Sequence, residues 1–199
     1  MISKLITTLI ISTASLSAFC QQSYGTLIAG SYQPSQTFAT LTTTASAGNT
    51  VYDFQLTAKD LNSLFTNGAF ISAIAVDVGS SSVIPTISSV TGGSPVSVAG
   101  GGGPSGAWDF KFDLTGPAQA RLTANETVSW RATFASPTTF SGLEFAMHVQ
   151  GLTTAQGDSA WYDNSAVNPV PEPESYAMLL AGLGLMGAVA RRRKTHTAS

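Results

Sequence analysis

The side chains best suited to binding chemistry cluster near the end of the chain, at Asp158, Trp161, Tyr162, Asp163 and Asn164. Oxygen ligands beside aromatic rings are typical of a calcium site or of a platform on which a sugar ring stacks. The spacing lacks the D-x-[DN]-x-[DN]-G pattern of a calcium loop. A structural alternative is a last turn that Trp161 packs onto the domain. Asp158, Trp161, Tyr162 and Asp163 are therefore candidate ligand contacts.

No catalytic set accompanies this cluster. His148 is the only histidine apart from His196 near the C-terminus, so neither a Ser-His-Asp triad nor a histidine metal site is predicted. Asp109 and Asp113 flank Lys111, and on a strand they would lie roughly 13 Å apart, too far for a glycosidase pair. We expect solvated strand faces here and a non-enzymatic protein without metal or cofactor, with a hydrolase as the open alternative.

The charge of the chain is unevenly distributed. The formal net charge is −2, but residues 21–170 carry four basic and nine acidic side chains, a balance of −5. An acidic segment without a basic cluster is a poor match for nucleic acid. Nucleic acid is therefore excluded as a partner.

The N-terminal residues have the order of a secretory signal. Lys4 precedes the apolar run 5–11, and small residues follow at 14–18. A positive start, a short apolar centre and small residues before the cut define such a peptide. The apolar run is also too short to span a membrane. We expect residues 1–20 to be a signal peptide, with signal peptidase and the secretion machinery as partners.

The cleavage position depends on the residues around Cys20. Ala18 and Cys20 fit the small-residue positions before the cut, which would make Gln21 the mature N-terminus. Cys20 also admits a lipoprotein interpretation in which its sulfur is acylated. Phe19 stands where such a signal prefers Gly, Ala or Ser, which favours ordinary cleavage.

The C-terminal segment is strongly polarised. Pro171, Glu172 and Pro173 precede the uncharged, mostly apolar run 175–190, and four basic residues follow: Arg191, Arg192, Arg193 and Lys194. As a helix the run would span about 24 Å of a hydrocarbon layer about 30 Å thick, and snorkelling arginines can make up part of the difference. The basic cluster predicts a cytoplasmic C-terminus with the main domain outside. The prolines keep the preceding backbone extended.

This tail resembles the PEP-CTERM protein-sorting domain of Gram-negative bacteria, because the proline-glutamate-proline tripeptide, the apolar helix and the arginine cluster occur in that order over about residues 168–194. The resemblance implies recognition by exosortase, a membrane processing enzyme. It further implies transient anchoring in the inner membrane, then a cell-surface or extracellular location, and association with exopolysaccharide and biofilm. An ordinary single-pass anchor is the alternative.

Alternating apolar and polar residues predict strands in the exported part of the chain. We expect them near 26–31, 38–44, 52–56, 70–78, 83–90, 108–114, 128–134 and 143–149, with a short helix near 59–67 and a flexible glycine-rich loop at 92–106. Short strands separated by turn residues favour an all-β fold, an antiparallel β-sandwich.

The expected division of the chain is a signal peptide at 1–20, the β-sandwich at 21–164, a linker at 165–170 and a sorting tail at 171–194 with a transmembrane helix at 175–190. The expected function is that of a non-enzymatic surface or extracellular-matrix protein sorted by an exosortase. The alternative is a carbohydrate-binding module exported by the same route.

Overall fold

The computed structural model describes residues 19–46, 48–79, 83–106, 108–140, 145–154 and 157–168. The expected signal peptide lies outside these residues except for Phe19 and Cys20, which belong to the first strand. The sorting tail, its apolar run and its basic cluster lie outside them as well. Within the described ranges, no helix has the length and apolar character needed to cross a membrane.

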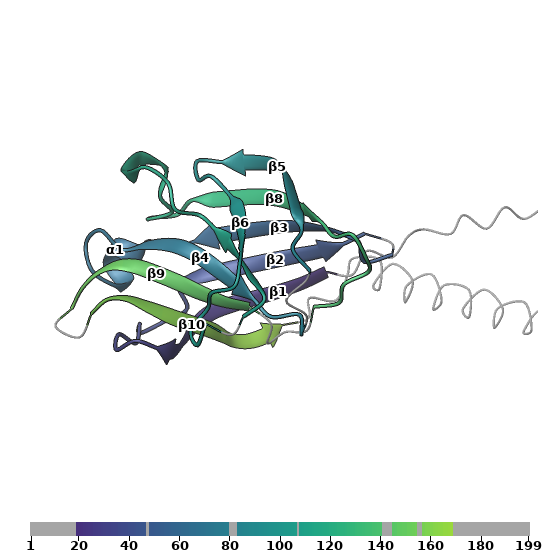
Figure 1. The fold of residues 1–199 in the computed structure, drawn as a ribbon. Coiled ribbons are helices and arrows are strands. Elements are labelled where there is room, and N and C mark those ends of the chain that lie inside the picture. The colour runs from purple at the N-terminus through teal and green to yellow at the C-terminus, as the bar shows by residue number, and fades with distance from the viewer. Residues whose placement is uncertain are drawn as a thin grey trace, which may run out of the picture.

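The described chain consists almost entirely of strands (Figure 1). The elements are β1 (Phe19–Ala29), β2 (Ala39–Ala45), β3 (Val51–Ala58), α1 (Leu61–Leu64), β4 (Phe70–Val76), β5 (Thr86–Gly92), β6 (Ser97–Gly100), β7 (Phe110–Asp113), a 3₁₀ turn η1 (Ala118–Ala120), β8 (Thr127–Thr133), β9 (Phe145–Thr154) and β10 (Gly157–Asn168).

The described strands form one ten-stranded sheet in the order β5-β8-β3-β2-β1-β10-β9-β4-β7-β6. Every strand pair is antiparallel. The sheet curls into a nearly closed, barrel-like shape in which the half running from β5 to β1 faces the half running from β10 to β6. The antiparallel all-β prediction is confirmed. The prediction of two separate sheets is corrected, because the β1–β10 ladder joins the two halves into one.

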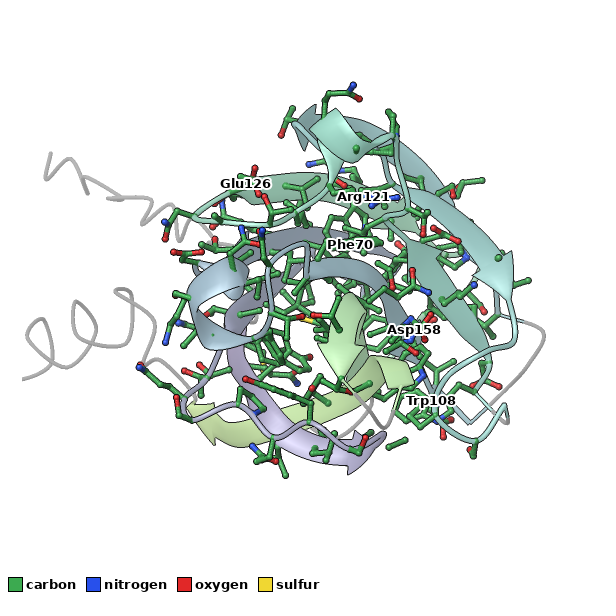
Figure 2. All side chains as sticks on the ribbon, turned by 90° about the vertical axis from the view of Figure 1, so that its left-hand side faces the viewer. Phe70, Trp108, Arg121, Glu126 and Asp158 are labelled. Atoms are coloured by element: carbon green, nitrogen blue, oxygen red, sulfur yellow. The ribbon has the colours of Figure 1, made fainter. Side chains whose placement is uncertain are left out.

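The strands form where the sequence alternates, since successive side chains on a strand point to opposite faces. In β3 the residues Tyr52, Phe54 and Leu56 are buried, while their neighbours face the solvent. Phe54 stacks on Trp130 of β8 with the ring centroids 5.2 Å apart, and its ring lies 5.1 Å from that of Phe112 on β7, in the facing half. Side chains from both halves thus fill the interior (Figure 2). This aromatic packing holds the curled sheet together.

The expected helix at 59–67 is a single turn. Asp60 caps α1, its side chain accepting hydrogen bonds from the backbone N–H groups of Asn62 and Ser63 at 3.1 and 3.3 Å. Leu61 is buried and anchors the turn. The amide of Asn62 also accepts a hydrogen bond from Gly68 N–H, which closes the connection before β4.

Two segments differ from the sequence-based expectation. The glycine-rich region 92–106, expected to be a loop, contains β6, which pairs with β7 so that Val98 lies opposite Phe112. Pairing with β7 makes this segment a strand although its local sequence favours strand formation only weakly. In addition, the region around Trp161, for which a final turn was one reading, is the long strand β10. This strand runs to Asn168 and thus into the segment 165–170 expected to be a linker.

Candidate functional site

The outward-facing side chains of β4, β7, β9 and β10 form a surface of mixed polar and apolar groups, which we call the Trp161 face. Register places Trp161 of β10 beside His148 of β9, and Ala73 of β4 on the other side of His148. A depression of about 190 Å³ lies on this face, lined by Ser72, Ala73, Gly102, Gly103, Lys111, Asp113, Thr115, His148, Gln150 and Trp161. One predicted ligand contact, Trp161, therefore borders a pocket.

The other predicted contacts do not all share the face of Trp161, because successive residues of a strand point to opposite faces of the sheet. Trp161 is half-buried and stacks on the His148 ring at 4.3 Å between centroids, with 16° between the planes. Tyr162 points inward and is fully buried, where its hydroxyl donates to the Tyr32 carbonyl at 2.6 Å. Burial raises the pKa of Tyr162. Trp161 and Tyr162 therefore cannot form one aromatic platform, which corrects the pairing suggested by their adjacency.

The two acidic candidates do not meet in the depression either. Asp158 is exposed, near enough to His148 for its charge to act on the imidazole. Asp163 lies on β10 opposite Thr26 of β1, and burial raises the pKa of its carboxyl group. Among the described residues, no group of three or more side chains could hold a metal ion. The observed arrangement thus offers an aromatic contact without an acidic ligand cluster.

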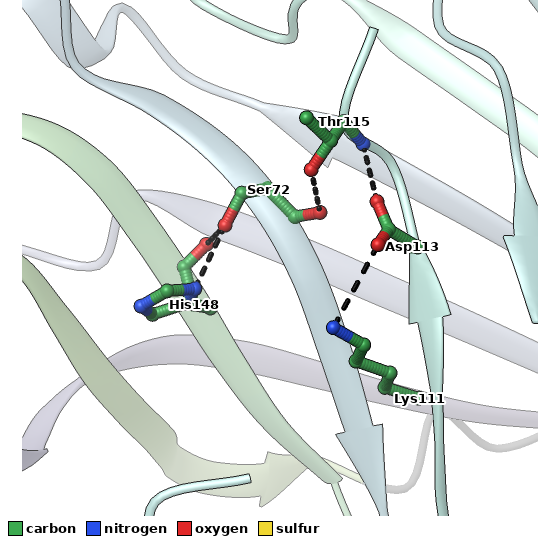
Figure 3. A network of polar contacts seen from close by, with 5 residues as sticks. All are labelled: Ser72, Lys111, Asp113, Thr115 and His148. Atoms are coloured by element: carbon green, nitrogen blue, oxygen red, sulfur yellow. Dashed lines mark hydrogen bonds and ion pairs between the residues drawn. The ribbon is translucent and has the colours of Figure 1, made fainter. Parts of the chain in front are cut away.

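The His148 ring is fixed by an irregularity in β4. The register shifts between Ile71 and Ala73, so the extra residue Ser72 also faces outward, as in a β-bulge. Ser72 Oγ lies 2.9 Å from His148 Nδ1 and 3.4 Å from the His148 carbonyl oxygen (Figure 3). Only 2% of Ser72 is exposed. The hydroxyl is covered, so it orients the imidazole and is badly placed to attack a bound substrate.

The surroundings of His148 keep its imidazole neutral. Burial, followed by the positive charge of Lys111, lowers the pKa of His148 to about 4, and the carboxylate of Asp158 opposes this shift. Lys111 itself lies 3.7 Å from an Asp113 oxygen, in an ion pair at the side of the depression (Figure 3). The other Asp113 oxygen accepts from the Thr115 N–H at 2.8 Å. At neutral pH the floor of the pocket is therefore an uncharged aromatic stack.

Glycines form one wall of the depression. Gly103 has a φ of +80°, and a Cβ at this position would lie 2.3 Å from the Trp108 ring. Only glycine permits both this conformation and so close an approach. Gly102 lies against the Lys111 stem, since a Cβ there would be 3.3 Å from Lys111 Cδ. The segment expected to be a flexible loop thus places backbone beside the pocket.

A second depression, of about 390 Å³, lies over the outer side of β2, β3 and β8. Its polar lining includes Thr42, Gln55 and the bidentate pair of Arg131 with Asp53, at 2.8 and 2.9 Å. Its aromatic lining residues, Phe54 and Trp130, are buried in the core. This depression therefore has no partly exposed ring for a ligand to stack on.

Sequence reasoning found Trp161 but missed most of its surroundings. His148, expected to be solvent-facing, is half-buried, with Trp161 stacked on its ring and the Ser72 hydroxyl at its Nδ1. Asp109, expected on a solvated face with Asp113, is only 9% exposed and accepts from the Val78 N–H at 2.8 Å. No local sequence pattern marks Ser72 as part of the site, because its position depends on a bulge in β4. Gln150 could have been found, since it shares the outward face with His148 two residues before it on β9.

The comparison with known families concerns the segment directly after β10. The model of the PEP-CTERM protein-sorting motif matches residues 169–194, which include the Pro171–Pro173 tripeptide and the basic cluster. This motif implies exosortase-dependent sorting of an exported protein. The chain therefore carries a PEP-CTERM protein-sorting motif after its β-rich domain. Neither the curated proteins nor the solved structures yielded a match to this chain.

Proposed function

We propose that this chain is a non-enzymatic surface or extracellular-matrix protein, associated with exopolysaccharide or biofilm after export. The observation that carries the proposal is the sorting motif at residues 169–194, which begins directly after β10 ends at Asn168. The motif implies an exosortase-dependent route. The matrix role is supported by a β-domain with low charge and a hydroxyl-rich outer surface.

The sorting step is tested with the full-length tagged chain in host cells with and without exosortase. We expect release or surface display in the first case and retention in the membrane in the second. Replacing both Pro171 and Pro173 by alanine should mimic the loss of the enzyme, because alanine does not restrict the backbone of the tripeptide as proline does. The matched control is Glu174→Ala, outside the tripeptide. A chain that stays entirely in the cytoplasm would contradict the proposal.

The matrix role requires a separate measurement. Deleting the gene should reduce the mass or cohesion of the extracellular matrix, and the full-length chain should restore it. A chain with the double proline substitution should fail to restore it, because it would not be released. Unchanged matrix in the deletion strain would refute the association with exopolysaccharide or biofilm while leaving the sorting route intact.

The two processing events belong to the same proposal. A signal peptide at 1–20 and a transient inner-membrane helix at 175–190, followed by a cytoplasmic basic cluster, would place the β-domain outside. Mass spectrometry of the released protein should give termini near Gln21 and near Pro171. A released chain that retains residues 175–190 would refute removal of the tail, and one that retains residues 1–20 would refute signal cleavage.

Carbohydrate binding is the second candidate, favoured by the half-exposed Trp161 at the border of a pocket that several polar side chains line. Aromatic rings offer sugars an apolar surface, while Gln150 and Thr115 supply hydrogen-bonding groups around it. A glycan array with the full-length protein should give binding that Trp161→Ala abolishes. The control is Thr42→Ala at the second depression, which should bind normally. Undiminished binding by Trp161→Ala would remove this candidate.

A further inference from the structure

Arg121 has no carboxylate partner among the described residues, and it lies beyond the Gln150 end of the depression on the Trp161 face. The guanidinium carbon of Arg121 sits 4.2 Å above the centre of the Phe70 ring (Figure 2). Its Nε is buried and has no hydrogen-bond partner within the described part of the chain. The described ion pairs involve Lys111 and Arg131, each with an aspartate. Arg121 is thus held on an aromatic ring without a counter-ion among the described residues.

The backbone places this arginine on the same surface as Trp161. Phe70 of β4 is the register partner of Gln150, which lines the depression and faces outward two residues from His148. From Phe70 to Trp161 the path crosses two strand spacings and two residues along β9. At ~4.8 Å per strand and ~3.3 Å per residue this is roughly 12 Å. A chain of a few linked rings can therefore reach both groups.

The ordinary role of such an arginine is to cover the ring beneath it, through cation–π attraction and packing of its stem. That role explains why Arg121 lies flat, but it does not use the terminal guanidinium nitrogens. A planar guanidinium pairs with a carboxylate through two parallel hydrogen bonds, and stacking on a ring holds it ready for this.

Nearby acidic groups leave room for a bound carboxylate. Asp113 is already paired with Lys111. Asp158 lies on β10, two strands from Phe70 of β4. Two strand spacings are about 10 Å, which is about one Debye length at 0.1 M salt, so its repulsion is largely screened. Glu126, in the same loop as Arg121, accepts hydrogen bonds from the Thr123 and Ala124 N–H groups instead, so Arg121 has no ion pair with a described carboxylate.

We propose that the Trp161 face binds an acidic polysaccharide, with one sugar ring on Trp161 and a carboxylate of another residue of the glycan at Arg121. Gln150, between the two, donates and accepts hydrogen bonds to the sugar hydroxyls. This inference rests on the proposed carbohydrate binding and adds the ligand class.

The test compares polygalacturonate oligomers with neutral maltooligosaccharides by calorimetry on the full-length protein in detergent. We expect the wild type to prefer the acidic oligomer. Arg121→Gln should weaken polygalacturonate binding by roughly 10-fold or more, the usual effect of losing a charge-assisted pair, and leave maltooligosaccharide binding unchanged. Trp161→Ala should abolish binding of both. Arg131→Gln, on the opposite half of the sheet, is the matched control and should bind like the wild type.

Arg121→Lys guards against a folding defect, because it keeps a cation on Phe70. It should retain the acidic preference with several-fold weaker binding, since lysine lacks the planar fork. Equal affinity of the wild type for both oligomers, or an acidic preference that survives Arg121→Gln, would overturn the acidic ligand class. Binding that depends on Trp161 alone would then leave the carbohydrate function standing. Absence of binding to either oligomer would overturn both.

Discussion

The buried imidazole of His148 makes the stability of the domain depend on acid. Its folded-state pKa is about 4, against 6.5 in the unfolded chain. As the pH falls below about 6.5 the unfolded chain takes up the proton first, so the stabilisation present at neutral pH is lost progressively down to about pH 4. The full shift corresponds to about 3.4 kcal/mol at ~1.36 kcal/mol per pKa unit. Because part of the ring is exposed and screened, we expect about 1–2 kcal/mol.

The assay is urea unfolding of the full-length protein at pH 7 and at pH 4.5. Other carboxyl groups also titrate in this range, among them Asp53, whose pKa is lowered by its hydrogen bond to Arg131. The comparison is therefore with His148→Gln, which keeps a side chain able to hydrogen-bond Ser72. The wild type should lose about 1–2 kcal/mol more than this variant between the two pH values.

An NMR titration measures the same quantity directly. The two histidines of the chain are His148 and His196, and the variant identifies which resonance belongs to His148. A His148 pKa near 6.5, or equal acid sensitivity of wild type and variant, would refute the reasoning. It would show that the Trp161 stack and the Ser72 hydrogen bond leave the ring open to water.

Two stability predictions follow from the packing. Gly92→Ala should lower the free energy of unfolding by about 2 kcal/mol or more, because φ is +102° and the new Cβ would lie 2.3 Å from the Thr127 carbonyl oxygen. The control is Gly93→Ala, whose Cβ would meet nothing within 4 Å. It should change the free energy of unfolding by less than ~0.5 kcal/mol. Equal effects in thermal unfolding would contradict this geometry. Phe54→Ala should cost about 3–5 kcal/mol in urea unfolding, because the ring contacts aromatic side chains of both halves of the sheet, while the exposed Thr57→Ala should cost little. A cost below ~1 kcal/mol for Phe54→Ala would show that the two halves are not packed as described.

The sequence predicted the strands well where a strict alternation met a buried face. Phe110 and Phe112 alternate with charged residues, and both aromatic rings lie in the core. Alternation fixes which residues face inward, but it does not say which strands are neighbours. The single sheet follows from pairing between β1 and β10, which lie at opposite ends of the described chain. No local pattern contains that information.

The candidate site was predicted only in part, for the same reason. Trp161 stood out by residue type, and its outward direction follows from the inward direction of Tyr162. Ser72 lies beside the His148 ring because a bulge adds one residue to β4, and no feature of the isolated strand marks that position. The glycine wall depends on how Trp108 folds over Gly103, which is a tertiary contact.

The pairing of Gln21 with Asn168 has a consequence for how the domain is presented. β1 begins and β10 ends at the same end of the sheet, while α1 lies at the opposite end (Figure 1). A tether attached after Asn168 therefore holds the body by its base, with α1 pointing away from the surface. In that orientation the Trp161 face stands upright on the surface beneath and is turned toward neighbouring copies. If this face binds glycan as proposed, one glycan strand would be able to run along the Trp161 faces of several copies.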